Sequence, residues 1–162
     1  MPRVPFEMLP DEGRIWVFGA GAALSADATA ALLREVDDYL DGWSAHGAPL
    51  TCARDWRDGR FLAIGVDQST AGASGCSIDA LFRILQGTER SLGVALVAGG
   101  RVFHRDAAGA VQCVDRATYA ARVRDGAIGA DTPVFDTTLT TVGSYRAHFE
   151  RPASSSWHAQ LA

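Results

Sequence analysis

The chain has no lysine, and all 15 of its basic residues are arginine. This absence excludes a Schiff-base lysine, a lysine nucleophile and the lysine of a phosphate-binding P-loop. The arginines also form no basic cluster. The net charge is -4, and no stretch places arginines between aromatic residues. Tight contact with a phosphate backbone needs such a cluster. We therefore expect no nucleic acid among the partners.

Paired cysteines and long apolar runs are missing as well. Cys52, Cys76 and Cys113 are widely spaced and form no Cys-x-x-Cys pair, so neither a disulfide framework nor a zinc ribbon is indicated. The four histidines show no metal-binding spacing, and we predict no metal and no cofactor. No apolar run reaches the ~18 residues of a membrane span, and the first residues lack the apolar core of a signal peptide. These absences predict a cytoplasmic protein with no membrane span.

What is present is the composition of a folded domain, with 48% hydrophobic and 21% charged residues over 162 positions. The hydrophobic pattern predicts strands at 14–18, 50–56, 60–66 and 93–98, and helices at 26–43 and 77–91. Ser25 is the expected cap of the first helix, Gly47 its expected left-handed end, and Asp58-Gly59 the turn of a hairpin. The order β-α-β-β-α-β predicts an α+β fold, a ferredoxin-like sandwich over residues 1–98.

Residues 99–162 are expected to form a small β-rich extension packed on this core, or a continuation of a single domain. A hairpin is predicted at 102–105 and 110–114, a short helix at 116–124 and a strand at 132–135. The end of the chain contains Trp157 and His158, which we interpret as a tail that docks in an apolar groove.

A glycine- and serine-rich loop, residues 67–79, joins the third predicted strand to the second predicted helix. Gly72 and Gly75 allow tight turns, and Ser77 is the predicted helix cap. Backbone amides and hydroxyls at a helix start can bind a carboxylate or phosphate. The candidate ligand-binding residues are Asp67, Ser69, Ser74, Gly75, Ser77 and Asp79. The same residues also suit an ordinary capped loop, in which Asp67 and Ser69 bond to neighbouring amides.

Cys76 suggests a different chemistry at the same loop. A helix start favours the thiolate, and a nearby histidine would complete a catalytic pair. His46 is the first candidate for this base, and His104, His148 and His158 are the alternatives. Asp67 and Asp79 flank the loop and would oppose the thiolate. A packed, unreactive Cys76 is the alternative, and burial is also expected for Cys52 and Cys113.

Four segments together resemble an uncharacterised bacterial family whose members often carry the label "ABC transporter ATPase". They are Trp43-Ser-Ala-His-Gly47, the loop 67–79, Asp131-Thr-x-Val-Phe135 and Ser156-Trp-His158. The resemblance implies no established reaction, and the missing lysine excludes a P-loop ATPase. Residues 102–135 also resemble the GYF-like adaptor modules of bacteria, which implies a protein partner.

The sequence thus predicts a binding or regulatory module for a small anionic ligand or a protein partner. One alternative is an enzyme with Cys76 as nucleophile. Another is a self-assembly module, such as a homodimer, because ferredoxin-like sheets often leave an edge or a face uncovered.

Overall fold

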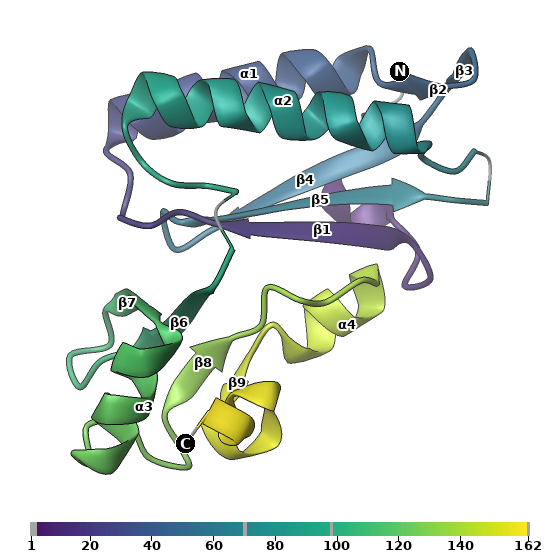
Figure 1. Cartoon of the computed structure of the whole chain (residues 1–162). Helices are drawn as coiled ribbons and strands as arrows, with labels where there is room; N and C mark the ends of the chain where they lie inside the picture. The colour runs from purple at the N-terminus through teal and green to yellow at the C-terminus, as the bar shows by residue number, and fades with distance from the viewer. Residues whose placement is uncertain (1–2, 70, 98, 162) are drawn as a thin grey trace. The chain divides into compact units, whose positions relative to one another are not determined.

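The computed structural model describes residues 3–69, 71–97 and 99–161, which combine α-helices with antiparallel sheets (Figure 1). Contacts divide the chain into two compact units. The N-terminal unit is Met1–Val97 with Thr138–Ala147, and the C-terminal unit is Ala98–Thr137 with His148–Ala162. Within the described residues, no helix is long and apolar enough to cross a membrane. The chain is therefore an α+β protein in which one segment, 138–147, returns to the first unit.

The N-terminal unit is built on a three-stranded sheet with the order β1-β5-β4. Its strands are β1 (Arg14–Gly19), β4 (Thr51–Arg57) and β5 (Phe61–Asp67), and β5 runs antiparallel to both neighbours. Asp58 and Gly59 join β4 to β5 with φ of 57° and 64°. Two consecutive residues with positive φ suit the right-handed twist of a hairpin, which is why Asp-Gly recurs there. The predicted hairpin is confirmed.

Two helices, α1 (Ala26–Asp41) and α2 (Gly75–Leu92), cover one face of this sheet (Figure 1). Ser25 caps α1 by accepting a hydrogen bond from the Ala28 amide at 3.1 Å, as predicted. The apolar stripes of both helices meet alternate residues of β5, and this burial drives their packing. The buried cluster includes Leu32, Val36, Leu40, Leu62, Ile64, Val66, Leu81 and Leu85.

The other face of the sheet meets the short 3₁₀ helix η1 (Phe6–Met8) with the residues after it, and α4 (Val142–His148). Gly65, in the middle of β5, has no side chain, and a Cβ there would lie 2.6 Å from Leu9 Cδ1 and 3.3 Å from Val142 Cγ2. Tyr145 donates a hydrogen bond to Asp55 Oδ2 at 2.8 Å. This second cover comes from segments at opposite ends of the unit's sequence.

The predicted strand at 93–98 is wrong for Gly93–Val97, and residue 98 lies outside the described residues. A fourth ferredoxin-like strand would pair with the free edge of β1. Two separate segments bond to that edge or its end instead. Gly21 donates its amide to the Ala95 carbonyl at 2.8 Å, and Ile15 donates to the Thr140 carbonyl at 3.0 Å. Because segment 138–147 bonds to one end of β1, the free edge of β1 is interrupted. Residues 93–97 therefore cannot pair with it along its whole length.

The ends of both predicted helices also need correction. Helix α1 stops at Asp41, and a short hairpin of β2 (Ser44–Ala45) and β3 (Ala48–Pro49) follows. His46 and Gly47 form its turn with φ of 53° and 78°, so Gly47 is a hairpin residue rather than a helix cap. Helix α2 begins two residues before the predicted cap at Ser77.

The C-terminal unit contains a four-stranded antiparallel sheet with the order β7-β6-β8-β9. Its strands are β6 (Arg101–Arg105), β7 (Val111–Asp115), β8 (Pro133–Phe135) and β9 (Glu150–Pro152). Helix α3 (Arg116–Arg124) follows β7, and the 3₁₀ helices η2 (Ala153–Ser155) and η3 (Trp157–Leu161) follow β9. The predicted hairpin, short helix and strand are confirmed. Helix α4, strand β9 and the 3₁₀ helices were not predicted.

Candidate functional site

The loop 67–79 contains two separate hydrogen-bonded groups rather than one site. In the first, Asp67 Oδ1 accepts from the Ser69 amide at 2.9 Å and from the Ser69 hydroxyl at 2.7 Å. These bonds to the charged form hold the pKa of Asp67 below its usual range. This is the local Asx-type turn that the sequence allowed as an alternative. Asp67 and Ser69 are occupied with each other.

The second group is the start of α2, where Ser74 and not Ser77 is the cap. The Ser77 amide donates to Ser74 Oγ at 3.2 Å, and the Ser74 amide donates to Ser77 Oγ at 2.9 Å. This reciprocal capping box fixes the first turn of the helix. The predicted cap at Ser77 is wrong, because the cap is Ser74, three residues earlier. Gly75, Cys76 and Ser77 are the first three residues of α2.

Aromatic side chains at the end of α1 hold the same turn in place. The Ser77 carbonyl accepts hydrogen bonds from the Tyr39 hydroxyl at 3.0 Å and from Trp43 Nε1 at 3.1 Å. Trp43 is buried, so this contact is shielded from water. The beginning of α2 is thus fixed both from within and by its neighbour.

The amides of Gly75 and Cys76 remain available at this helix start. Both residues are exposed, and no acceptor for either amide is found among the described residues. The first amides of a helix lack intrahelical partners and carry the positive end of its dipole. These two amides stay the candidate positions for the small anion that the sequence predicted, whereas Ser74 and Ser77 use their hydroxyls in the capping box.

Cys76 and His46 are not shown to form a pair. Both are exposed, Cys76 in the first turn of α2 and His46 in the turn between β2 and β3. Within the described part of the chain, no hydrogen bond joins Cys76 to any histidine. Asp79 lies one turn into α2, where its carbonyl accepts from Arg83 Nε at 3.4 Å. Of the other cysteines, Cys52 is buried as predicted, and burial raises its pKa to about 12, whereas Cys113 is only half-buried.

Asp67 and Ser69 border a surface hollow of about 610 Å³ with residues near the N-terminus. Glu12 lines the same hollow. Two carboxylates in one depression repel an anion. The first half of the loop is therefore unsuited to the anionic ligand that the sequence predicted for it.

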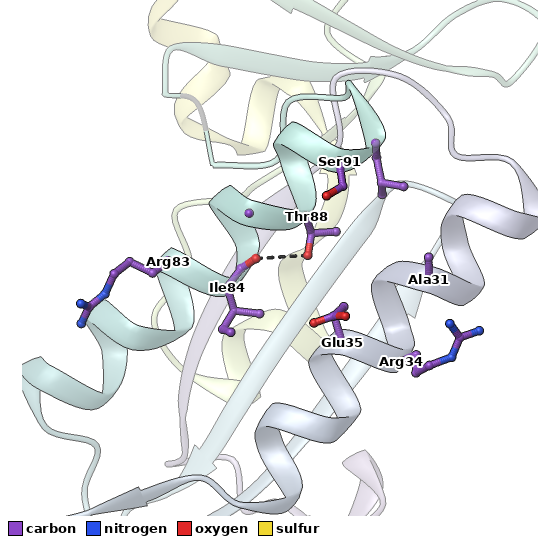
Figure 2. Close-up of a pocket in the computed structure, with 9 residues that line it drawn as sticks. Ala31, Arg34, Glu35, Arg83, Ile84, Thr88 and Ser91 are labelled. Carbon is purple, nitrogen blue, oxygen red and sulfur yellow. Dashed lines mark hydrogen bonds between the residues drawn. The ribbon is translucent and has the colours of Figure 1, made fainter.

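A second depression, of about 390 Å³, lies between α1 and α2 (Figure 2). Arg34 and Glu35 come from α1, and Arg83 and Thr88 come from α2. The Thr88 hydroxyl already donates to the Ile84 carbonyl at 3.1 Å. Arg34, Glu35 and Arg83 are exposed, so this depression is a solvated groove between two helices.

The C-terminal unit contains two buried histidines, His104 and His158, which the sequence offered only as possible bases for Cys76. His104 Nδ1 donates to the Arg105 carbonyl at 2.9 Å, and its Nε2 accepts from Arg122 Nη1 at 2.9 Å. Burial lowers the pKa of His104, so the ring is neutral and its two nitrogens have different roles. In strand 101–105, side chains alternate between the two faces, so His104 lies on the same face as Val102. This alternation could have predicted the burial of His104 from the sequence.

The predicted docking of the C-terminal tail holds within this unit. Trp157 Nε1 donates to Asp136 Oδ1 at 3.2 Å, and His158 is 1% exposed. Ser156, two residues before His158, is also buried. Nothing in the sequence distinguishes this histidine from an ordinary tail residue, because the groups around it include Tyr119 and Asp136, which are distant in sequence.

Within the described residues, no three His, Cys, Asp or Glu side chains cluster in a way that could hold a metal ion. The chain matches no protein-family model, no curated protein and no solved structure.

Proposed function

We propose that this chain is a cytoplasmic, non-catalytic binding module that binds a small anion at the start of α2. Its scaffold is an incomplete ferredoxin-like sandwich, an assignment supported by the strand order β1-β5-β4 and the two helices on one face. The observation that carries the proposal is the pair of exposed amides of Gly75 and Cys76 at the start of an 18-residue helix, for which the described residues supply no acceptor. The Ser74–Ser77 capping box and the bonds from Tyr39 and Trp43 keep this pair in a fixed orientation.

Catalysis by Cys76 has less support than binding. A nucleophile needs a base within hydrogen-bond reach and a site that excludes water. Cys76 is exposed, and His46 occupies a separate exposed turn. Self-assembly also has less support, because Met8 is the only large hydrophobic side chain that is mainly exposed among the described residues.

Titration with inorganic phosphate and with acetate tests the proposal, using the amide signals of Gly75 and Cys76 in ¹H–¹⁵N NMR spectra. We expect both amide signals to shift as anion is added, and the shifts to level off at high anion concentration. Gly75→Pro removes one amide at the first helical position, where proline is well tolerated, and Ser74 already has the extended backbone that a following proline requires. We expect a stably folded variant whose phosphate affinity is about tenfold lower.

Cys76→Ala separates the binding proposal from the enzyme alternative, since it removes the sulfur and keeps the amide. Phosphate affinity should be unchanged in this variant, and Gly87→Ala serves as a control remote from the helix start. The proposal is wrong if neither anion shifts the two signals, or if Gly75→Pro binds phosphate as tightly as the unaltered protein.

A further inference from the structure

The segment 156–161, which contains η3, lies in the C-terminal unit without joining its sheet. Its backbone amides bond only to carbonyls within residues 153–161. Among the described residues, a single hydrogen bond joins the segment to the rest of the unit, from Trp157 Nε1 to Asp136 Oδ1 at 3.2 Å. An element with so few bonds to its neighbours opens at a low cost in free energy. The segment can therefore separate from the unit while the sheet β7-β6-β8-β9 stays paired.

The packing between this segment and α3 is also incomplete. A hollow of about 230 Å³ is lined by Tyr119 and Val123 of α3 and by His158 of the segment, among others. Protein interiors are normally close-packed, and surfaces on either side of a void lose the dispersion contacts that would hold them together. Trp157 and Leu161 supply the remaining apolar contacts, and both are only partly buried. The docking of the segment therefore depends strongly on His158, its buried ionisable side chain.

The docked position of His158 favours the neutral ring. The side chain is 1% exposed, and its Nδ1 atom lies 2.7 Å from Ser156 Oγ. Its Nε2 atom is buried and has no hydrogen-bond partner among the described residues. A protonated ring has two N–H donors, so in the docked segment one donor of a charged group would have neither an acceptor nor water. In the released segment, water supplies both bonds.

The titratable groups that face His158 come from four parts of the unit. Tyr119 of α3 lies with its ring centroid 5.8 Å from the imidazole, and burial raises the pKa of this tyrosine, so it is uncharged. Burial is the largest cause that lowers the pKa of His158, and Asp136, just after β8, acts against it. Arg151 of β9 and His104 of β6 lower the pKa further, to about 4. The surroundings therefore oppose a positive charge on the docked ring.

We propose that the segment 156–161 is released by acid: protonation of His158 frees it from the C-terminal unit and uncovers the apolar cluster on which Trp157 and Leu161 pack. The sign of the linkage is the one that release requires. The ordinary pKa of histidine is 6.5 and that of docked His158 is about 4, so docking loses stability as the pH falls through this range. Across the whole range, the docking equilibrium shifts about 300-fold toward release. The uncovered cluster consists of Val102, Tyr119, Ile128, Val134 and Ala153.

NMR spectra recorded between pH 6.5 and 4 test this proposal. The observed signals are the indole ¹⁵N–¹H signal of Trp157 and the amide signals of residues 157–161. We expect them to move to the positions of a disordered chain, with a midpoint inside this pH range, while the amide signals of β6, β7 and α3 remain those of the folded unit. His148→Gln, at an exposed position, is the control and should keep the midpoint of the unaltered protein.

Two variants separate protonation of His158 from a general loss of stability. The double variant Ser156→Ala with His158→Phe keeps an aromatic ring that cannot be protonated, so the segment should stay docked down to pH 4. Arg151→Met removes a like charge beside the imidazole, which raises the pKa of docked His158. Release should then require a lower pH, whereas a substitution that only weakened docking would move release to a higher pH.

The proposal is overturned if the signals of residues 157–161 keep their docked positions down to pH 4, or if they change only together with those of β6 and α3. It is equally overturned if Arg151→Met leaves the midpoint unchanged or raises it, or if the double variant releases the segment as the unaltered protein does. None of these outcomes depends on phosphate binding at Gly75, which lies in the N-terminal unit.

Discussion

His104 and His158 show how single residues of the C-terminal unit depend on burial. Both side chains are almost completely buried, and burial lowers the pKa of each. His104 uses both ring nitrogens, whereas His158 uses one. A histidine that is neutral when folded gains a proton more readily when unfolded, so both residues link the stability of this unit to pH.

The stability of the C-terminal unit should fall in mild acid because of His158. Burial lowers its pKa from 6.5 to about 4, with Arg151 and His104 acting in the same direction and Asp136 acting against them. The unfolded chain therefore binds a proton between these two pH values that the folded unit does not. The contribution of neutral His158 to the free energy of unfolding is complete above pH 6.5. It is lost as the pH falls to about 4, which lowers that free energy by about 3 kcal/mol.

Urea unfolding at several pH values, followed by the amide signals of the C-terminal unit, measures this loss. The double variant Ser156→Ala with His158→Phe should have a clearly smaller slope between pH 6.5 and 4. His148→Gln, at an exposed position, is the control and should keep the original slope. An unchanged slope in the double variant would show that His158 is not the residue responsible.

At the scale of elements, two glycines within a strand and a helix have opposite effects on stability. Gly65 lies in β5, where Leu9 and Val142 occupy the space that a side chain would need. Gly87 lies in α2, where a Cβ would meet only the flexible end of Arg90 at 4.0 Å. The first glycine permits close packing of two layers, and the second only costs conformational entropy.

The pair Gly65→Ala and Gly87→Ala should therefore change stability in opposite directions. Gly65→Ala forces Leu9 or the strand to move and should destabilise the protein by about 1–3 kcal/mol. Gly87→Ala should stabilise it by about 0.5–1 kcal/mol. Urea denaturation of the two variants measures both changes. Equal effects would mean that the layer containing Leu9 and Val142 is not packed on β5 as described.

Elements that depend on neighbouring residues were predictable from the sequence, and those that depend on distant ones were not. Ser25 and Asp58-Gly59 act within four residues, and both signals were correct. The apolar run 93–97 has the composition of a strand, but whether it can pair with β1 depends on Thr140, which bonds to β1 from more than forty residues away. The amides proposed to bind an anion lie in the predicted loop, whereas the burial of His158 depends on groups distant in sequence, such as Tyr119, which only the fold brings beside it.

At the scale of the molecule, the returning segment 138–147 completes the N-terminal unit. Its backbone bonds to residues near the start of the chain, with Val142 donating to the Gly13 carbonyl at 2.8 Å and Gly143 donating to the Asp11 carbonyl at 2.9 Å. Tyr145 is buried against Asp55, and burial and this carboxylate both raise the pKa of its hydroxyl. Without this segment, one face of the sheet loses part of its cover.

A fragment of residues 1–97 should therefore be only partly folded, and a peptide of residues 138–147 should restore its structure. The peptide supplies Val142 and Tyr145 to the uncovered face and an acceptor for the Ile15 amide. Near-UV circular dichroism and amide dispersion of the fragment, with and without the peptide, measure the effect. A peptide with Val142→Asp is the control and should have no effect. A fragment that is fully folded alone would contradict the prediction.

The chain passes between its two units three times, near residues 97, 137 and 147. A protein emerges from the ribosome from its N-terminus at about 5–20 residues per second, and domains commonly fold in that order. Here the first unit lacks its last segment until residue 147 has been made, after residues 98–137 of the second unit. The sheet of the first unit therefore stays without part of its cover while residues 98–137 are being synthesised.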